Sequence, residues 1–431
     1  MRPGEQQPET EHDLAMAKNG EKGYHSGRQW RHGSWFSYTL DPKGAKSLAI
    51  EATYWGDDRD RTFDVLANGV VVKTVTLDGS HRGKFFSETY PIPSEALAVR
   101  RDGKIRVTFA ATNGGLAGGL FDLRLMKAED AYLFSYFSNK DYGGRRGEAA
   151  GLHLAYSYDG LKWTELNGDH PYLVPVLGKD KLMRDPSICR GPNGTFHLVW
   201  TTSWHDRMIG HASSKDLVHW SEQQEIPVMA DEPSARNCWA PEVTYNPDDG
   251  LFYIYWATTI PGRFTPIRDM DKKEDGLNHR IFLTTTADWK TFSPTRLWFN
   301  PDFSAIDAAC VRDVKNGDWI MVVKNENHTP AEKNIRVTRT KELAKGFPTD
   351  VSPKISPNWV EGPSPLFVGD TLYVYIDFYG KGGYGAIKSD DHGKTWSTVD
   401  KATMSFPKGI RHGTAFAVDK SVVDKLVALE H

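Results

Sequence analysis

The chain has few cysteines, no long hydrophobic run and no excess of either charge. Its 431 residues include only Cys189, Cys238 and Cys310, whose spacing fits neither a metal site nor a complete disulfide framework. We expect all three to pack as small apolar side chains. No run is long enough to span a membrane. The balance of 53 Lys and Arg against 56 Asp and Glu excludes the strongly basic surface that nucleic-acid binding needs.

The two ends of the given sequence say little about the location of the protein. The first residues, Met-Arg-Pro-Gly-Glu-Gln-Gln, lack the apolar core of a signal peptide. The last three, Leu-Glu-His, resemble the junction of an expression tag. We therefore expect an exported protein, periplasmic or extracellular, whose signal is missing from this sequence. The oligomeric state stays open.

Aromatic residues and glycine are what the chain has in abundance. Aromatics make up 12% of it, with 14 Trp, and there are 39 Gly. Short aromatic-rich strands separated by Gly, Asn and Asp turns are typical of all-β proteins. Most of these aromatics are expected in the core, but sugar rings also bind on aromatic faces.

Two parts precede the main repeat. Residues 1–24 are polar and without periodicity, which predicts a tail. Over 25–128, about seven short strands and an Asn68-Gly69 hairpin turn predict a β-sandwich. This part resembles the small β-sandwich domains appended to bacterial polysaccharide-degrading enzymes. Since no cluster of aromatics can be placed on one exposed face, we expect it to support its neighbour rather than to bind sugar.

An internal repeat fills residues 129–431. A turn of the form Ser/Thr-x-Asp/Glu, followed by an aromatic, begins at Ser157, Ser214, Thr286, Thr340 and Ser389. The period of about 50–70 residues is that of a β-propeller blade with loops. We predict an all-β chain with a five-bladed β-propeller of four-stranded blades. Residues 414–418 should pair with 131–137 and close the ring, which removes an exposed sheet edge.

The innermost strand of each repeat is headed by an ionisable residue. These are Asp185, Glu242, Asp307, Glu361 and His412. In a propeller these strand starts surround one funnel, and converging like charges cost stability unless they are used. Convergent carboxylates suit glycosidic bond cleavage. One acid protonates the leaving oxygen, one carboxylate activates water or attacks the sugar, and a third raises the pKa of the acid.

The motifs around these residues resemble glycoside hydrolase family 43. They are Arg-Asp-Pro-Ser-Ile at 184–188, Trp-Ala-Pro-Glu at 239–242, Ile-Asp-Ala at 306–308 and Val-Glu-Gly-Pro-Ser at 360–364. The resemblance implies a five-bladed propeller, inversion at the anomeric carbon, and arabinofuranosidase, xylosidase or galactosidase activity. It also implies that Asp185 is the general base, Asp307 the pKa modulator and Glu361 the general acid. Ala308 stands where the family usually has proline.

Other residues near the funnel mouth are predicted to bind substrate. They are Arg184, Trp204, Trp239, Glu242, Lys324, Glu326, Tyr379, Arg411 and His412. The long loop 258–280 could wall off one end of the site, which favours removal of terminal sugars. No cofactor is required, and the metal content is unknown. His412 resembles a family histidine near the propeller axis, where a bound cation is an option.

The leading hypothesis is an exo-acting, inverting glycosidase that removes a terminal α-L-arabinofuranose from plant-type polysaccharide or oligosaccharide. A β-xylosidase, β-galactosidase or galactofuranosidase of the same fold is the alternative. A retaining fructosidase-type enzyme is disfavoured because Arg184 stands where those enzymes have Asn. The turn at Ser389 suggests a sialidase, but that turn marks propellers generally. A non-catalytic sugar-binding propeller stays open.

Overall fold

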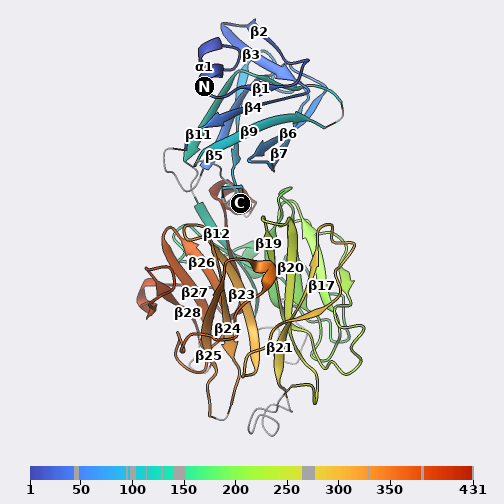
Figure 1. Cartoon of the computed structure of the whole chain (residues 1–431), viewed down its shortest axis with the longest axis vertical. Coiled ribbons are helices and arrows are strands. Elements are labelled where there is room, and N and C mark those ends of the chain that lie inside the picture. The colour runs from blue at the N-terminus through green and yellow to red at the C-terminus, as the bar shows by residue number, and fades with distance from the viewer. Residues whose placement is uncertain are drawn as a thin grey trace. The chain divides into compact units, whose positions relative to one another are not determined.

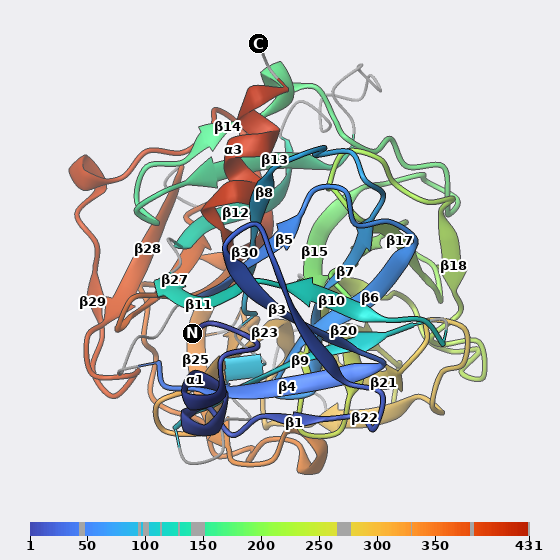
Figure 2. The same cartoon turned by 90° about the horizontal axis from the view of Figure 1, so that it is seen from above.

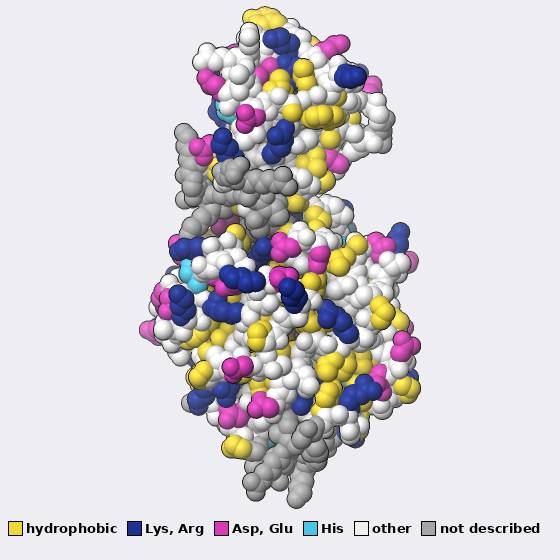
Figure 3. All heavy atoms as spheres, in the orientation of Figure 1, with side chains coloured by type: hydrophobic (Ala, Val, Ile, Leu, Met, Phe, Trp, Pro, Cys, Tyr) yellow, Lys and Arg dark blue, Asp and Glu magenta, His cyan; other side chains and the backbone are white. Residues whose placement is uncertain are grey.

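The structure, a computed structural model, divides the chain into two compact units (Figure 1). One comprises Met1–Asp130 with Gly191–Thr195, and the other Ala131–Arg190 with Phe196–His431. The residues described are 1–42, 48–93, 96–97, 103–112, 114–127, 130–138, 151–264, 277–328, 330–379 and 383–429. On the face shown in Figure 3, basic and acidic side chains are interspersed over both units.

The first unit is a β-sandwich. A five-stranded sheet has the order β1-β4-β9-β6-β7, and two three-stranded sheets have the orders β10-β3-β2 and β11-β5-β8. The fully buried rings of Tyr38, Tyr54, Phe63 and Phe109 come from both layers and pack into one core. The elements are α1 (Gln6–Glu11), β1 (Ala15–Met16), β2 (Glu21–His25), β3 (Arg28–Gly33), β4 (Trp35–Leu40), β5 (Leu48–Trp55), β6 (Arg61–Ala67), β7 (Val70–Leu77), β8 (Phe85–Pro91), β9 (Ile105–Ala111), β10 (Ala117–Leu120) and β11 (Asp122–Lys127).

The prediction that residues 1–24 form a tail is wrong, because these residues are part of the sandwich. They form α1, β1 and the start of β2, and β1 pairs with β4. Glu9, only 4% exposed, makes a bidentate ion pair with Arg31 at 2.6 Å and accepts the hydroxyl of Tyr38 at 2.9 Å. A buried, hydrogen-bonded charge pair connects this segment to the sandwich. Because the segment is polar, its composition did not indicate that it is folded.

The sandwich also gathers aromatics that the sequence could not place together. Trp55 lies 4.4 Å from His25 and 4.9 Å from Phe85 between ring centroids, and Arg28 lies over the Phe85 ring. His25 and Trp55 are far apart in sequence, and β2 and β5 belong to different sheets. Trp55 and Phe85 are half-buried, and support of the neighbouring domain rather than sugar binding stays a prediction.

The second unit is built from five antiparallel sheets. Its strands are β12 (Asp130–Ser138), β13 (His153–Ser157), β14 (Thr164–Glu165), β15 (Arg184–Arg190), β16 (Phe196–Thr201), β17 (Ile209–Ser214), β18 (Gln224–Ile226), β19 (Trp239–Asn246), β20 (Leu251–Thr259), β21 (His279–Thr286), β22 (Arg296–Phe299), β23 (Ala305–Asp313), β24 (Asp318–Asn325), β25 (Asn334–Thr340), β26 (Glu361–Val368), β27 (Thr371–Asp377), β28 (Tyr384–Ser389), β29 (Ser397–Thr398) and β30 (Ile410–Asp419). Its helices are η2 (Asn167–Asp169), η4 (Leu343–Lys345), η5 (Lys401–Thr403) and α3 (Lys420–Ala428).

The five sheets form a closed ring. The inner strands β15, β19, β23, β26 and β30 contact one another in that order, and β30 contacts β15 again. Figure 2 shows the sheets following one another around this ring from green to red. The sheet β14-β13-β12-β30 joins both ends of the unit, which confirms the predicted closure. A glycine is needed there, since a Cβ on Gly413 would lie 1.8 Å from the carbonyl oxygen of Ser135.

The prediction of four strands in every blade is wrong for the fourth sheet. Among the described residues that sheet contains only β23, β24 and β25. The chain beside β25 donates just two backbone hydrogen bonds to it, from Ser352 to Val337 and from Ile355 to Ile335. Pro353 and Pro357 lie in this stretch and have no N–H to donate, so no regular outer strand forms.

The outer turns are stabilised by hydrogen bonds between their own residues. In the copy at Ser214, the hydroxyl oxygen accepts the N–H of Leu217, and one oxygen of Asp216 accepts the N–H groups of Val218 and His219. The copies at Ser157, Thr286 and Ser389 make equivalent bonds. The copy at Thr340 has Glu342 where the other copies have the shorter aspartate, and it begins at the last residue of β25.

Two further expectations concern cysteines and membranes. All three cysteines are free, and Cys238 is buried. Within the part of the chain that the structure describes, no helix has the length and apolar character needed to cross a membrane.

Candidate active site

A β-bulge opens each of the inner strands β15, β19, β23 and β26. The register with the neighbouring strand shifts at Arg184/Ser187, Trp239/Glu242, Ile306/Ala309 and Glu361/Ser364. The second residue of each bulge has a positive φ: Asp185 (52°), Ala240 (47°), Asp307 (53°) and Gly362 (57°). This conformation is uncommon without glycine, and bulges re-aim the side chains beside them.

The bulges show that the five predicted ionisable residues do not occupy one equivalent position. Asp185 and Asp307 are the second residues of their bulges, whereas Glu361 is the first residue of its own. Glu242 is the fourth, level with Ser187. The expectation of five equivalent strand heads is therefore corrected, although all five lie on the inner strands.

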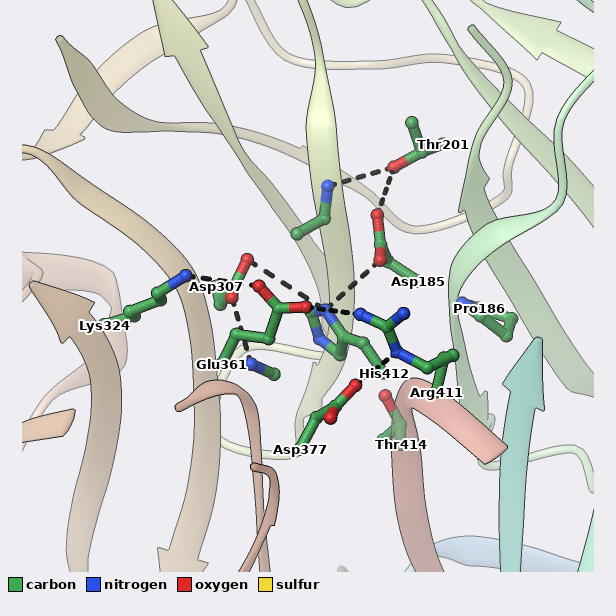
Figure 4. Close-up of polar contacts among 12 residues, drawn as sticks. Asp185, Pro186, Thr201, Asp307, Lys324, Glu361, Asp377, Arg411, His412 and Thr414 are labelled. Atoms are coloured by element: carbon green, nitrogen blue, oxygen red, sulfur yellow. Dashed lines mark hydrogen bonds and ion pairs between the residues drawn. The ribbon is translucent and has the colours of Figure 1, made fainter. Parts of the chain in front are cut away.

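His412 bridges two of the predicted catalytic carboxylates (Figure 4). Its Nδ1 lies 3.2 Å from Oδ1 of Asp185 and 4.0 Å from Oδ1 of Asp307. Burial would lower the pKa of His412, but the negative charges of Asp307 and Asp185 raise it to about 9. The imidazolium therefore supplies a positive charge between two carboxylates.

Asp185 is strongly favoured in its ionised form. Burial would raise its pKa, but the charges of His412 and Arg184 and the hydrogen bond from Thr201 lower the pKa to about 2. The Thr201 hydroxyl donates to Oδ2 of Asp185 at 2.9 Å and accepts the N–H of Ala240 at 3.0 Å. Asp185 is thus held in orientation from two neighbouring strands.

Asp307 has the opposite tendency. Burial raises the pKa of Asp307, and the charges of Glu361 and Asp185 raise it further against the attraction of His412 and Lys324. Its Oδ2 accepts the N–H of Gly362 at 3.0 Å. Only glycine fits at 362, because a Cβ would lie 2.5 Å from the His412 ring.

Glu361 lies between two cations. Its Oε1 is 2.8 Å from Nη2 of Arg411, and its Oε2 is 3.3 Å from Nζ of Lys324. Burial would raise the pKa of Glu361, but Lys324 and Arg411 outweigh burial and lower it. The predicted upward shift is therefore wrong for the free protein. Asp307 is the catalytic carboxylate whose pKa is raised, mainly by its burial.

Each of these cations has a second acidic partner. Lys324 Nζ lies 2.6 Å from Glu326, which in turn pairs with Lys333 at 2.5 Å. Arg411 Nε contacts Asp377 at 2.5 Å. Glu326, which was predicted to bind substrate, is thus paired with both Lys324 and Lys333.

Asp377 was not among the site residues predicted from the sequence, although a signal for it existed. Asp377 ends β27 opposite Glu361, just as Lys324 lies opposite Ile306 on β24. A polar residue closing a second strand contacts the start of the next inner strand, as Lys324 contacts Glu361 and Asp377 contacts Arg411.

Aromatic residues surround this network. The guanidinium carbon of Arg184 lies 4.6 Å from the ring centroids of both Phe137 and Trp204. Trp204 packs edge-on against Trp239, and the Trp239 indole donates to the Trp204 carbonyl at 2.9 Å. Trp204 is 39% exposed, so its ring is available to a sugar. The Tyr379 ring lies 5.1 Å from Nζ of Lys324.

Glu242 stands apart from the other predicted residues. It is 5% exposed and accepts hydrogen bonds from the hydroxyls of Ser187 (2.5 Å) and Thr414 (2.8 Å). Burial raises the pKa of Glu242 to about 7 despite these bonds. Both carboxylate oxygens of Glu242 accept hydrogen bonds from other inner strands, and its binding of substrate stays a prediction.

The described residues contain no group of three or more His, Cys, Asp or Glu side chains that could hold a metal ion. A cation near His412 stays a prediction. Of the long loop 258–280 predicted to cover the site, residues 265–276 lie outside the described residues.

Several solved structures are similar to this chain. An α-L-arabinofuranosidase from Lactobacillus brevis is 18% identical, with 50% of this chain and 72% of that chain covered and a TM-score of 0.39. A family 43 protein from Bacillus licheniformis is 20% identical (54% and 43% covered, TM-score 0.40). An exo-β-1,3-galactanase from Clostridium thermocellum is 14% identical (54% and 50% covered, TM-score 0.40). This chain spans less than two thirds of the length of the last two.

Family models match both units. A family of unknown function matches residues 1–126, and a comparison with curated proteins returned no match. The model described as "Probable glycosyl hydrolase domain", of the family 43 group, matches residues 128–424. That match covers more than half of the chain and spans the five sheets of the propeller. The chain therefore belongs to the glycosyl hydrolases of the family 43 group.

Proposed function

We propose that this glycosidase is exo-acting and removes one terminal sugar with inversion, with α-L-arabinofuranose as the first candidate and plant-type polysaccharide or oligosaccharide as the substrate. β-Xylose, β-galactose and galactofuranose are the alternatives. The observation that carries the proposal is that three carboxylates on inner strands lie in different electrostatic environments. The pKa of Asp185 is lowered, that of Asp307 is raised, and Glu361 lies between the cations Lys324 and Arg411.

In the proposed reaction, ionised Asp185 takes a proton from a water molecule. The water oxygen bonds to the anomeric carbon while the bond from that carbon to the leaving oxygen breaks. Protonated Glu361 delivers its proton to the leaving oxygen. Asp307 accepts the N–H of Gly362, next to Glu361, and shares His412 with Asp185, which supports a role in orienting the other two.

The acid role places a demand on Glu361. Since Lys324 and Arg411 lower its pKa, the free enzyme holds Glu361 ionised at neutral pH. Substrate that excludes water and weakens one of these contacts would raise its pKa toward the value a proton donor needs. The Lys324 contact is the longer of the two at 3.3 Å, yet the charge of Lys324 lowers the pKa of Glu361 more than that of Arg411 does.

The side chains that support sugar binding are the exposed Trp204 with its neighbours Arg184 and Trp239, and Tyr379 over Lys324. An aromatic face can pack against the C–H face of a sugar ring. Export from the cell stays a prediction.

The test uses Glu361→Gln against aryl glycosides of α-L-arabinofuranose, xylose, galactose and galactofuranose. The variant should lose at least about 100-fold in kcat on the best substrate. Glu342→Gln, an exposed glutamate of the outer turn at Thr340, is the matched control. A near-wild-type rate for Glu361→Gln would sink the assignment, and proton NMR of the first-formed anomer decides between inversion and retention. Sugar binding by calorimetry without any product would favour the non-catalytic alternative.

A further inference from the structure

A cavity of about 520 Å³ lies beside the charged network. It is lined by residues that include Tyr379, Tyr384, Lys401, Phe406, Lys408 and Arg411. These come from the chain just after β27, the start of β28, the segment that precedes β30, and β30 itself. Its volume falls in the range of about 300–1,000 Å³ that is typical of small-molecule sites.

The cavity has an excess of positive charge. Its acid, Asp377, is engaged with Arg411, and Arg411 is also engaged with Glu361. Lys401 and Lys408 form no ion pair with any described residue, and Nζ of Lys401 lies 4.8 Å from the Phe378 ring centroid. The neighbouring Asp400 uses its carboxylate to accept the N–H of Ala402 at 3.0 Å. Two ammonium groups therefore border the cavity without a counter-charge.

Tyr384 gives a second, independent indication of a ligand. Its side chain is 6% exposed, and its hydroxyl has no hydrogen-bond partner among the described residues. Burial and the charges of Asp377 and Glu361 raise its pKa, so the hydroxyl keeps its proton as a donor. A buried donor without a partner is costly, and a ligand oxygen in the cavity would satisfy it. Tyr379 and Phe406 add aromatic surface for a sugar ring.

The position of the cavity relates it to the leaving group. Arg411 lines the cavity and lies 2.8 Å from Glu361, the proposed donor to the leaving oxygen. The side of the site next to Glu361 is the side on which the leaving residue departs. The occupant is therefore expected to be the sugar to which the cleaved residue was attached.

We propose that this cavity binds an acidic sugar residue, carrying a carboxylate or a sulfate ester, directly adjoining the sugar that is cleaved. The anion pairs with Lys401 and Lys408, Tyr384 donates to a ring or hydroxyl oxygen, and the aromatic residues contact the ring. The placement on the leaving side rests on the proposed function, in particular on the role of Glu361. The binding site itself does not depend on turnover.

The first experiment measures binding of single sugars to the wild-type chain by calorimetry. The probes are galacturonic acid, galactose 6-sulfate and galactose. One of the acidic sugars should bind at least about tenfold more tightly than galactose at low salt, because charge-assisted bonds are the strong ones. Added NaCl should reduce this preference. The acidic sugar that binds tells carboxylate from sulfate, and equal binding of all three overturns the proposal.

The second experiment replaces the cations. Lys401→Gln/Lys408→Gln should remove the preference for the acidic sugar, and Tyr384→Phe should weaken all the ring sugars. Lys290→Gln, an exposed lysine of the outer turn at Thr286, is the matched control and should keep the preference. Acidic-sugar binding that persists in the double variant would contradict the proposal. Circular dichroism of each variant establishes that the fold is retained.

The two proposals fail separately. Binding of acidic sugars without hydrolysis of any aryl glycoside would leave the cavity assignment standing and remove the proposed function. Hydrolysis of an aryl glycoside without any preference for acidic sugars would do the reverse.

Discussion

The outer turns and the inner strand starts of the propeller share one backbone feature, a residue with a positive φ, but they differ in function. In four outer turns the residue after the acid has a positive φ: Gly160, Leu217, Trp289 and His392. At four inner strand starts the second residue of the bulge has one: Asp185, Ala240, Asp307 and Gly362. Both regions therefore hold most of these residues in a conformation that side chains disfavour.

The two regions differ in where the stabilising bonds come from. An outer turn is satisfied within about five residues of sequence, as when Asp216 accepts the N–H of Val218 and of His219. At an inner strand start, the backbone N–H is accepted by a side chain from another sheet. Thr201 accepts the N–H of Ala240, and Asp307 accepts the N–H of Gly362. Local bonding makes a turn self-sufficient, whereas bonding between sheets leaves the aimed side chains available for chemistry.

The largest effect should come from an inner start. Asp185→Asn keeps the size of the side chain but removes the charge that would activate water. We expect kcat on the best aryl glycoside to fall about 10²–10⁴-fold. Asp216→Asn in an outer turn is the control and should keep kcat within about twofold, since it lies outside the network. Comparable losses in both variants would erase the distinction between the regions.

The second prediction concerns the cation that lies over the proposed acid. Lys324 lowers the pKa of Glu361, so Lys324→Met should raise this pKa. A proton donor with a higher pKa stays protonated to higher pH. The alkaline limb of kcat/KM against pH should then move upward by about one unit or more. Lys345→Met, on the exposed side of η4, should leave the limb unmoved. A downward shift in Lys324→Met would argue against Glu361 as the donor.

The same comparison explains how far the sequence could be used. Repeated Ser/Thr-x-Asp turns predicted the number of blades, and the pairing of 414–418 with 131–137 predicted ring closure. Both depend on local pattern and are confirmed by the structure. The position of Glu242 along its inner strand depends on the bulge, and the ion pair of Asp377 with Arg411 depends on a contact between strands far apart in sequence. Alternation along a strand does not reveal an inserted residue, so the depth of a side chain in the funnel was not predictable.

The N-terminal unit makes the same point. Glu9 and Arg31 are separated by 22 positions and meet only in the folded sandwich. A polar segment held by one buried pair has the composition of a tail. What the sequence lacked was any periodic apolar signal for β1 and β2, whose side chains are largely exposed.

The third prediction tests the charge shared at the inner starts. The pKa of His412 is raised to about 9 in the fold and is about 6.5 in an unfolded chain. The stability that this charge contributes is complete below about pH 6.5 and is lost as pH rises through 9, an effect of about 3 kcal/mol. His412→Gln should therefore remove much of the fall in unfolding free energy between pH 7 and 9. Asp185, Asp307 and Glu242 face this imidazole, and Asp185 and Glu242, with pKa values of about 2 and about 7, stay ionised across the upper part of this window.

Denaturant unfolding at pH 7 and pH 9 measures this difference. His219→Gln, in the outer turn at Ser214, is the matched control because its imidazole is exposed. An unchanged difference between the two pH values in His412→Gln would show that the imidazolium is not what stabilises the inner starts.

The smallest effect belongs to the outer turns. Asp216→Ala deletes an acceptor for two backbone N–H groups, which is comparable to losing a helix cap, and should cost about 1 kcal/mol of unfolding free energy. Glu342→Ala, at the same place in the turn at Thr340, should change stability by less than about 0.5 kcal/mol. In that copy the Thr340 hydroxyl accepts only the N–H of Glu342 itself, at 3.3 Å. Denaturant unfolding of both variants compares them. If Glu342→Ala cost as much as Asp216→Ala, the hydrogen bonds of the short aspartate would not be what stabilises the turn, and self-sufficiency would have to come from the packing of the aromatic that follows.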